Sequence, residues 1–183
     1  MRGITLLSLA ALTACASGSS STGAEPQTMR IVGSGGLGSG SVGMRSASST
    51  ASVSKVAFPL DRAWRALPAV YDSLKIPPTT LDPKTHHFGN EGMKIRQRLG
   101  GVQLSKYIDC GQAQIGPSAD SYDVFLNVTT TLSAVNAGET EVATTVDAAA
   151  KPLNFGQDYS RCTSKGTLEN AIATILASKL APK

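Results

Sequence analysis

Two long stretches in which apolar and polar residues alternate restrict the fold more than any other feature of the chain. In residues 122–132 nearly every second side chain is apolar, and the same alternation returns in residues 142–148. Residues 136–138 lie between them and read Asn-Ala-Gly, which suits a turn. Because successive side chains of a strand point to opposite faces, each stretch is predicted to have one buried and one solvated face. The sequence therefore predicts a long antiparallel hairpin.

The end of the chain has the apolar spacing of a helix that covers a sheet. Thr163 or Ser164 is predicted to cap its start, while Lys179 and Lys183 suit the negative end of the helix dipole. The apolar residues recur at intervals of three and four positions, so they lie on one helix face. They are Leu168, Ala171, Ile172, Ile175, Leu176 and Leu180.

A second helix is predicted near the start of the folded part. Residues 53–58 are predicted as a strand that Pro59 ends. Asp61 is then expected to cap a helix whose apolar face extends to Leu74. Pro68 lies inside this pattern and lacks a backbone donor, so either a kink or an irregular first turn is expected.

Shorter strands are predicted between this helix and the long hairpin. Residues 86–90 are expected to form one short strand. Residues 93–99 and 102–108 are predicted as a hairpin, because Gly100 and Gly101 between them suit the positive dihedral angles of a tight turn.

Together these elements predict an α+β fold, with a curved antiparallel β-sheet, an N-terminal helix and a long C-terminal helix packed across the sheet. The strand-to-helix passage at residues 56–64 and the terminal helix resemble those of helix-grip domains. That architecture is shared by START-like lipid-transfer proteins and by the lipoprotein of the outer-membrane β-barrel assembly machinery. Residues 53–181 are expected to form this single domain, and the resemblance implies a fold, not a function.

The first residues resemble the precursor of a bacterial lipoprotein. Arg2 precedes an apolar run that is too short to span a bilayer as a mature helix, which is typical of a signal peptide over residues 1–14. The run ends in Leu-Thr-Ala-Cys at residues 12–15, which matches a lipobox. The resemblance implies that Cys15 carries diacylglycerol and an N-acyl chain such as palmitate, which together anchor the protein stably to a membrane.

Residues 15–52 are expected to be the lipidated N-terminus and a flexible tether rich in glycine and serine, with a short strand predicted at residues 29–32. Ala16 stands where some bacteria place the aspartate that retains lipoproteins in the inner membrane. The lipoprotein resemblance therefore implies a cell-envelope protein, with the periplasmic side of the outer membrane favoured.

Cys110 and Cys162 are the two cysteines left once Cys15 carries lipid. In an oxidising envelope they are expected to form a disulfide, which stabilises the fold by roughly 4 kcal/mol on a chain-entropy estimate. Metal binding by these cysteines with His86 and His87 is disfavoured, because no close Cys-x-x-Cys or His-x-x-x-His spacing is present.

Residues 33–43 contain two overlapping matches to the glycine pattern of dinucleotide-binding loops. That site also needs a following helix and an acidic residue about twenty positions later, but the next acidic residue after the glycines is Asp61 and the intervening residues are poor helix formers. We therefore expect no nucleotide and no other cofactor. The net charge of +4 without a basic stripe likewise gives no indication of nucleic-acid binding.

Three basic residues, Lys94, Arg96 and Arg98, alternate with apolar residues in the predicted hairpin. They are candidates for contact with an anionic group, such as a lipid headgroup or an acidic partner. The alternative is a solvated face that discourages pairing between sheet edges, and the sequence favours this second interpretation.

The functional expectation is a membrane-anchored, non-catalytic envelope lipoprotein used for assembly, scaffolding or protein interaction. The alternative is a carrier or sensor of a small apolar ligand or lipid held between the sheet and the C-terminal helix. The alanines at 143, 148–150, 171, 173 and 177 either leave room for such a ligand or allow close packing of helix on sheet. An enzyme is not expected, since His86 and His87 are the only histidines and no activated nucleophile stands out. Asp109, Asp120 and Asp123 are interpreted as solvated strand ends.

Overall fold

The computed structural model describes residues 51–153 and 159–181. The predicted signal peptide, Cys15, the strand predicted at residues 29–32 and the predicted tether as far as residue 50 lie outside the described residues, whereas Ser52 at the end of that tether belongs to β1. The elements in chain order are β1 (Ser52–Val56), α1 (Leu60–Ser73), β2 (Thr80–Asp82), β3 (His87–Arg96), β4 (Arg98–Leu99), β5 (Val102–Gln103), the 3-10 helix η1 (Leu104–Lys106), β6 (Ile108–Asp109), β7 (Gln112–Ala113), β8 (Gly116–Pro117), α2 (Ser118–Ser121), β9 (Asp123–Asn136), β10 (Glu139–Lys151), β11 (Ser160–Ser164) and α3 (Thr167–Leu180).

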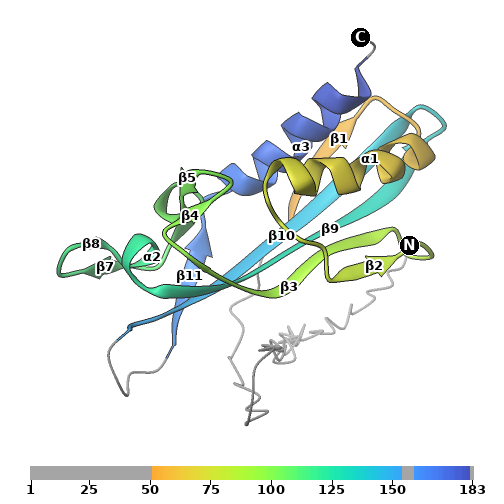
Figure 1. The fold of residues 1–183 in the computed structure, drawn as a ribbon. Helices are drawn as coiled ribbons and strands as arrows, with labels where there is room; N and C mark the ends of the chain where they lie inside the picture. Colours follow the sequence, from red (N-terminus) through yellow and green to blue (C-terminus); the bar gives the residue numbers. More distant parts are fainter. Residues whose placement is uncertain (1–50, 154–158, 182–183) are drawn as a thin grey trace, which may run out of the picture.

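The α+β class is confirmed, because the described residues form a seven-stranded antiparallel sheet with helices packed on it (Figure 1). Its strand order is β2-β3-β9-β10-β11-β6, and β1 also pairs with β10. Residues 140–144 of β10 pair with β1, while residues 148–150 pair with β11. One edge of β10 is thus shared by two strands placed end to end.

The long hairpin predicted from the alternation is confirmed as β9 and β10. Val128 is paired with Val146, and the two strands stay in register over most of their length. The apolar face is almost wholly buried: Val124, Leu126, Val128, Leu132, Val142 and Ala148 are each at most 3% exposed. The register shifts between Glu139 and Thr140, directly after the turn.

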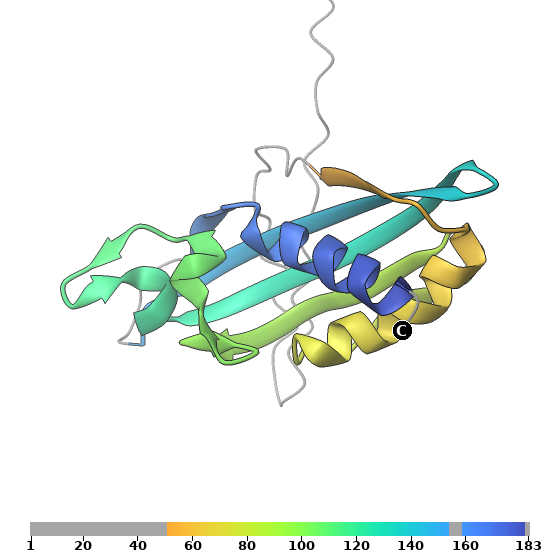
Figure 2. The ribbon, with the colours of Figure 1, turned by 90° about the horizontal axis from the view of Figure 1, so that it is seen from above.

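Helices α1 and α3 lie on the same face of the sheet and pack against each other (Figures 1 and 2). The stripe predicted for the last helix is confirmed, because Leu168, Ile172 and Leu176 are fully buried. Helix α1 contributes Leu67 and Tyr71, which are also fully buried. These apolar contacts form the main core of the domain.

A chain of hydroxyl groups crosses the core between α1 and the hairpin. The Tyr71 hydroxyl lies 2.9 Å from Thr130 Oγ1, which lies 3.0 Å from Thr144 Oγ1. Burial raises the pKa of Tyr71 well above its usual range. Each buried hydroxyl thus has a partner, which removes the cost of burying it in an apolar layer.

Both predicted helix caps are wrong. Helix α1 starts at Leu60 with Pro59 at the cap position, so Asp61 lies in the first turn and makes no side-chain cap. Thr163 and Ser164 belong to β11, and α3 starts only after Gly166, whose φ of 73° is the left-handed conformation that glycine adopts readily. For α3, the predicted cap residues are instead part of a sheet strand, whereas for α1 the helix begins one residue before Asp61.

The hairpin predicted at residues 93–108 is also wrong in its extent. The turn at Gly100 and Gly101 exists, but it joins only the two-residue strands β4 and β5. Residues 93–96 instead continue β3 and pair with β9. Pro68, by contrast, lies inside α1, which continues past it to Ser73.

Ile172→Ala should lower the free energy of unfolding by about 2–5 kcal/mol, because it leaves a cavity in the fully buried contact between α3 and the sheet. Urea denaturation followed by circular dichroism measures this loss. The matched control is Ile115→Ala at a side chain that is 88% exposed, and its effect should stay within about 0.5 kcal/mol. Equal losses in the two variants would contradict the assignment of Ile172 to the core.

Candidate functional site

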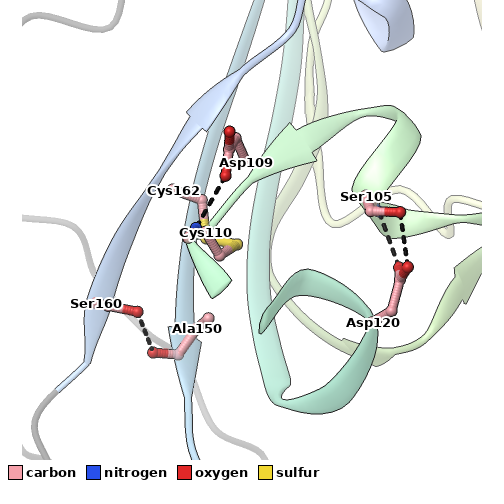
Figure 3. The surroundings of a disulfide bond; sticks show 8 residues. Ser105, Asp109, Cys110, Asp120, Ala150, Ser160 and Cys162 are labelled. Atoms are coloured by element: carbon pink, nitrogen blue, oxygen red, sulfur yellow. Dashed lines mark hydrogen bonds between the residues drawn. A yellow bond between two sulfur atoms is a disulfide. The ribbon is translucent and has the colours of Figure 1, made fainter. Parts of the chain in front are cut away.

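The predicted disulfide between Cys110 and Cys162 is present (Figure 3). Its S–S distance is 1.99 Å, and it joins residues 52 positions apart. Cys162 lies in β11, whose neighbour β6 ends immediately before Cys110. The bond therefore attaches the segment after β6 to the main sheet.

Beyond the disulfide the chain forms a small projecting hairpin of β7 and β8, which lies at one end of the sheet (Figure 1). Its root is closed by a hydrogen bond that the Ser118 N–H donates to the Gly111 carbonyl at 2.9 Å. Ile115 lies in the turn between the two strands and is 88% exposed. It is the most exposed of the large apolar side chains in the described part of the chain.

Helix α2 follows this hairpin and is held in place by hydrogen bonds from η1. Ser105 donates two hydrogen bonds to the Asp120 carboxylate, one from its backbone N–H (2.9 Å) and one from its hydroxyl (2.6 Å) (Figure 3). The base of the hairpin is thus fixed by the disulfide on one side and by a charge-assisted pair of hydrogen bonds on the other.

A surface hollow of about 420 Å³ lies beside the hairpin, with an apolar lining for the most part. It is formed by Ala113, Gln114, Ile115, Ser121, Tyr122, Pro152 and Leu153. Leu153 is itself 51% exposed. The hairpin, the hollow and Leu153, here called the braced end, combine exposed apolar groups with a supported backbone.

The three basic residues predicted for anion contact do not lie on one strand. Lys94 and Arg96 lie in β3, but Gln97 has a φ of 63°, so the strand ends there and Arg98 belongs to β4. Arg98 donates a hydrogen bond to the Gly101 carbonyl at 2.8 Å.

Lys94 and Arg96 converge on a single carboxylate. The Lys94 Nζ lies 2.8 Å from Asp123 Oδ2, and the Arg96 Nη2 lies 2.7 Å from Asp123 Oδ1. The hydrogen bond from Lys94 is the main cause that lowers the pKa of Asp123, and the bond from Arg96 lowers it further. Two cations sharing one anion leave a local positive excess on this face.

Two aromatic rings accompany these charges on the sheet face opposite to the helices. Phe125 and Tyr159 meet edge to face with ring centroids 5.3 Å apart. Lys94 Nζ lies 5.9 Å from the centre of the Phe125 ring, and Lys151 Nζ lies 5.1 Å from that of Tyr159. Cation–π contacts of this kind hold the lysine chains against the sheet.

The two histidines and the three aspartates that the sequence offers for chemistry each contact a different partner. The His86 ring packs edge to face on Trp64, and His87 Nδ1 lies 2.9 Å from Thr131 Oγ1. Asp109 accepts a hydrogen bond from the Gly111 N–H, while Asp120 and Asp123 bind Ser105 and the two cations of β3. Among the described residues no group of three or more His, Cys, Asp or Glu side chains is placed to hold a metal ion.

Comparison of the chain with models of protein families, with curated proteins and with solved structures finds no match. In the ranges that the structure covers, none of the helices has the length and apolar character needed to cross a membrane.

Sequence reasoning missed the apolar tip and Tyr159. Strands of two residues show no periodicity, so β7 and β8 could not be recognised by alternation. The signal that was present is Gly116-Pro117 after Ile115, a pair that marks a turn. Tyr159 precedes β11 without any local pattern, and only pairing of β11 with β10 brings it near Phe125.

Replacing both Cys110 and Cys162 by serine should lower the free energy of unfolding by about 4 kcal/mol, because the unfolded chain regains the entropy of an open loop. Chemical denaturation of the oxidised protein and of the double variant measures the difference. A reducing agent should produce the same loss in the wild type and none in the variant. A loss under about 1 kcal/mol would show that the bond adds little constraint.

The carboxyl group of Asp123 should titrate below the usual aspartate pKa of about 3.9. Lys94→Ala should raise its pKa toward that value, because the main stabilising hydrogen bond is lost. Since the folded-state pKa is depressed, the interaction stabilises the fold above the unfolded pKa, and this stability disappears as the pH falls through the folded pKa. NMR titration of the carboxyl carbon tests both statements, with Lys55→Ala as a control on another strand. An unchanged pKa in Lys94→Ala would contradict the pairing.

Proposed function

We propose that this chain is a lipoprotein of the bacterial cell envelope, anchored to a membrane through Cys15, and that its folded part binds another envelope protein through the braced end. The observation that carries the protein-binding role is Ile115, a large aliphatic side chain that is 88% exposed on a supported hairpin.

An exposed apolar tip favours binding when its backbone is held in place. Binding costs conformational entropy if a loop must be ordered, and a loop that is already braced avoids most of this cost. The disulfide at Cys110 and the bonds between Ser105 and Asp120 supply such bracing. A partner with an apolar pocket would cover Ile115 and gain roughly 2 kcal/mol from burying it.

The fold proposed for this role is of the helix-grip type. Support comes from α3, which follows the last strand β11 and returns across the sheet, and from α1, which packs beside it on the same face (Figure 2). The underside of α3 is lined by fully buried side chains such as Leu168 and Ile172. The described hollow lies instead beside Ile115 and Tyr122, which favours contact with a protein surface over a ligand beneath the helix.

The lipobox-like residues 12–15 support the proposed lipid attachment. A mature chain with three acyl chains would stay at the membrane surface while its domain remains in water. The tether of residues 16–50 would then let the domain reach a partner at some distance from the bilayer.

The test is site-specific photo-crosslinking of the full chain in a bacterium that processes lipoproteins. A photo-reactive amino acid at position 115 should crosslink to one defined protein, while the same amino acid at position 135 should not. Val135 is the matched control, since it is 43% exposed at the far end of β9. Ile115→Asp should remove co-purification of that protein without loss of thermal stability.

The lipid anchor is checked in the same experiment. The wild type should incorporate labelled palmitate and fractionate with membranes, whereas Cys15→Ala should do neither and should lose most of the crosslink from position 115. Equal crosslinking from positions 115 and 135 would refute the protein-binding role. Palmitate incorporation into Cys15→Ala would refute the anchor.

A further inference from the structure

On the side of β3 that faces away from β9, the second half of the strand has no partner strand in the described part of the molecule. Strand β2 pairs with β3 only at residues 87–89, while β9 pairs with it on the other side down to Arg96. Thr79 accepts a hydrogen bond from the Glu91 N–H, so the backbone of β3 on this side has partners as far as Glu91. We call the side of residues 93–96 that faces away from β9 the open edge.

The side chains of the open edge alternate in chemistry. Met93 and Ile95 point toward the helix side, where they pack on the core but remain only half-buried. Lys94 and Arg96 point to the opposite face, with side chains that are 59% and 48% exposed. A strand added here would therefore meet an apolar row on one face and a cationic row on the other.

The charge of the cationic row favours an acidic occupant. Lys94 and Arg96 share the single carboxylate of Asp123, and Arg98 lies just beyond them. Glu91 is the acidic group of the strand, but it lies before the register shift between Asn90 and Met93, next to Thr79. Along β3 the excess of positive charge therefore lies at the open edge and continues into β4.

The chain's own N-terminal segment does not match this chemistry. Residues 1–50 contain one acidic residue, Glu25, against Arg2, Arg30 and Arg45. An anionic lipid surface would satisfy the cations but would leave the backbone groups and the half-buried Met93 and Ile95 unused. An extended acidic segment of another protein uses all three features.

We propose that the open edge of β3 binds an extended segment of a partner protein in which acidic and apolar residues alternate, and that this segment joins the sheet as an added strand. The inference deepens the proposed protein-binding role and rests on it. The acidic side chains lie against Lys94 and Arg96, the apolar ones cover Met93 and Ile95, and backbone hydrogen bonds join the two chains. The same cations repel basic edges and so limit unspecific pairing.

Peptide binding to the full chain in detergent micelles tests the proposal. The probe is a synthetic peptide of about six residues, the length of an ordinary strand, that alternates valine and aspartate. It should bind saturably by fluorescence anisotropy and should slow hydrogen exchange in residues 93–96. A peptide N-methylated along the edge that faces β3 should bind at least about tenfold more weakly, because it loses backbone donors.

Charge variants provide the second arm. A peptide of valine and lysine should not bind the wild type, but it should bind the Lys94→Glu/Arg96→Glu variant. Because this variant places acidic groups beside Asp123, its melting temperature is measured in parallel. Arg98→Glu, which lies outside the main sheet, should weaken binding of the acidic peptide without lowering the melting temperature. Lys55→Glu on β1 is the matched control and should leave binding unchanged.

Several results would overturn the inference. These are no saturable binding, equal binding of the N-methylated peptide, or protection outside residues 93–96. Binding to vesicles of anionic phospholipid with no binding of the peptide would assign the cations to a lipid surface, and self-association that Lys94→Glu abolishes would assign the edge to a second copy. Because Ile115→Asp should bind the peptide as the wild type does, failure here is distinguishable from failure of the crosslink at position 115.

Discussion

The burial of one face of the β9–β10 hairpin under two helices is the constraint on which the other features depend. Val128 and Val146 lie opposite each other at its centre, and both point to the side that α1 and α3 cover. A shift of one residue in this pairing would turn the apolar row to solvent and the threonine row into the core. The register of the hairpin therefore fixes where every neighbouring strand must lie.

One consequence is that the two faces of the sheet have different roles. The covered face holds the core and the paired hydroxyls of Tyr71, Thr130 and Thr144. The other face is left to charges and small polar groups, with aromatic contact at Phe125. Substitutions on the outer face therefore do not touch the packing beneath α3, although the ion pairs of Asp123 on that face contribute to stability. The braced end and the open edge both lie where β9 begins, so one partner could meet them together.

Local patterns in the sequence predicted those parts of the fold that local physics decides. Alternation over a long stretch identified β9 and β10, and the spacing of Leu168 and Ile172 identified α3. The pairing of Cys110 with Cys162 was predicted from the number of cysteines under the expectation that the chain is exported. The errors arose where a distant strand competes for the same residues. Residues 93–96 read equally well as one arm of a local hairpin, and their pairing with β9 depends on a contact about thirty positions away. Nothing local distinguishes the two outcomes, and the tip at Ile115 carries no periodicity at all.

The sharing of one edge of β10 by β1 and β11 has a mechanical consequence. The described part of the chain begins at Ala51, directly before β1, so a pull on the N-terminal segment, such as the proposed lipid anchor would exert, reaches first the five residue pairs between β1 and β10. Strand β1 buries only Val56 below a tenth of its surface, and no disulfide links it to its neighbour, whereas the disulfide at Cys162 joins β11 covalently to the segment after β6. Under such a load β1 would be the first strand to separate from the sheet, and the load on the remaining strands would rise only after β1 had unfolded.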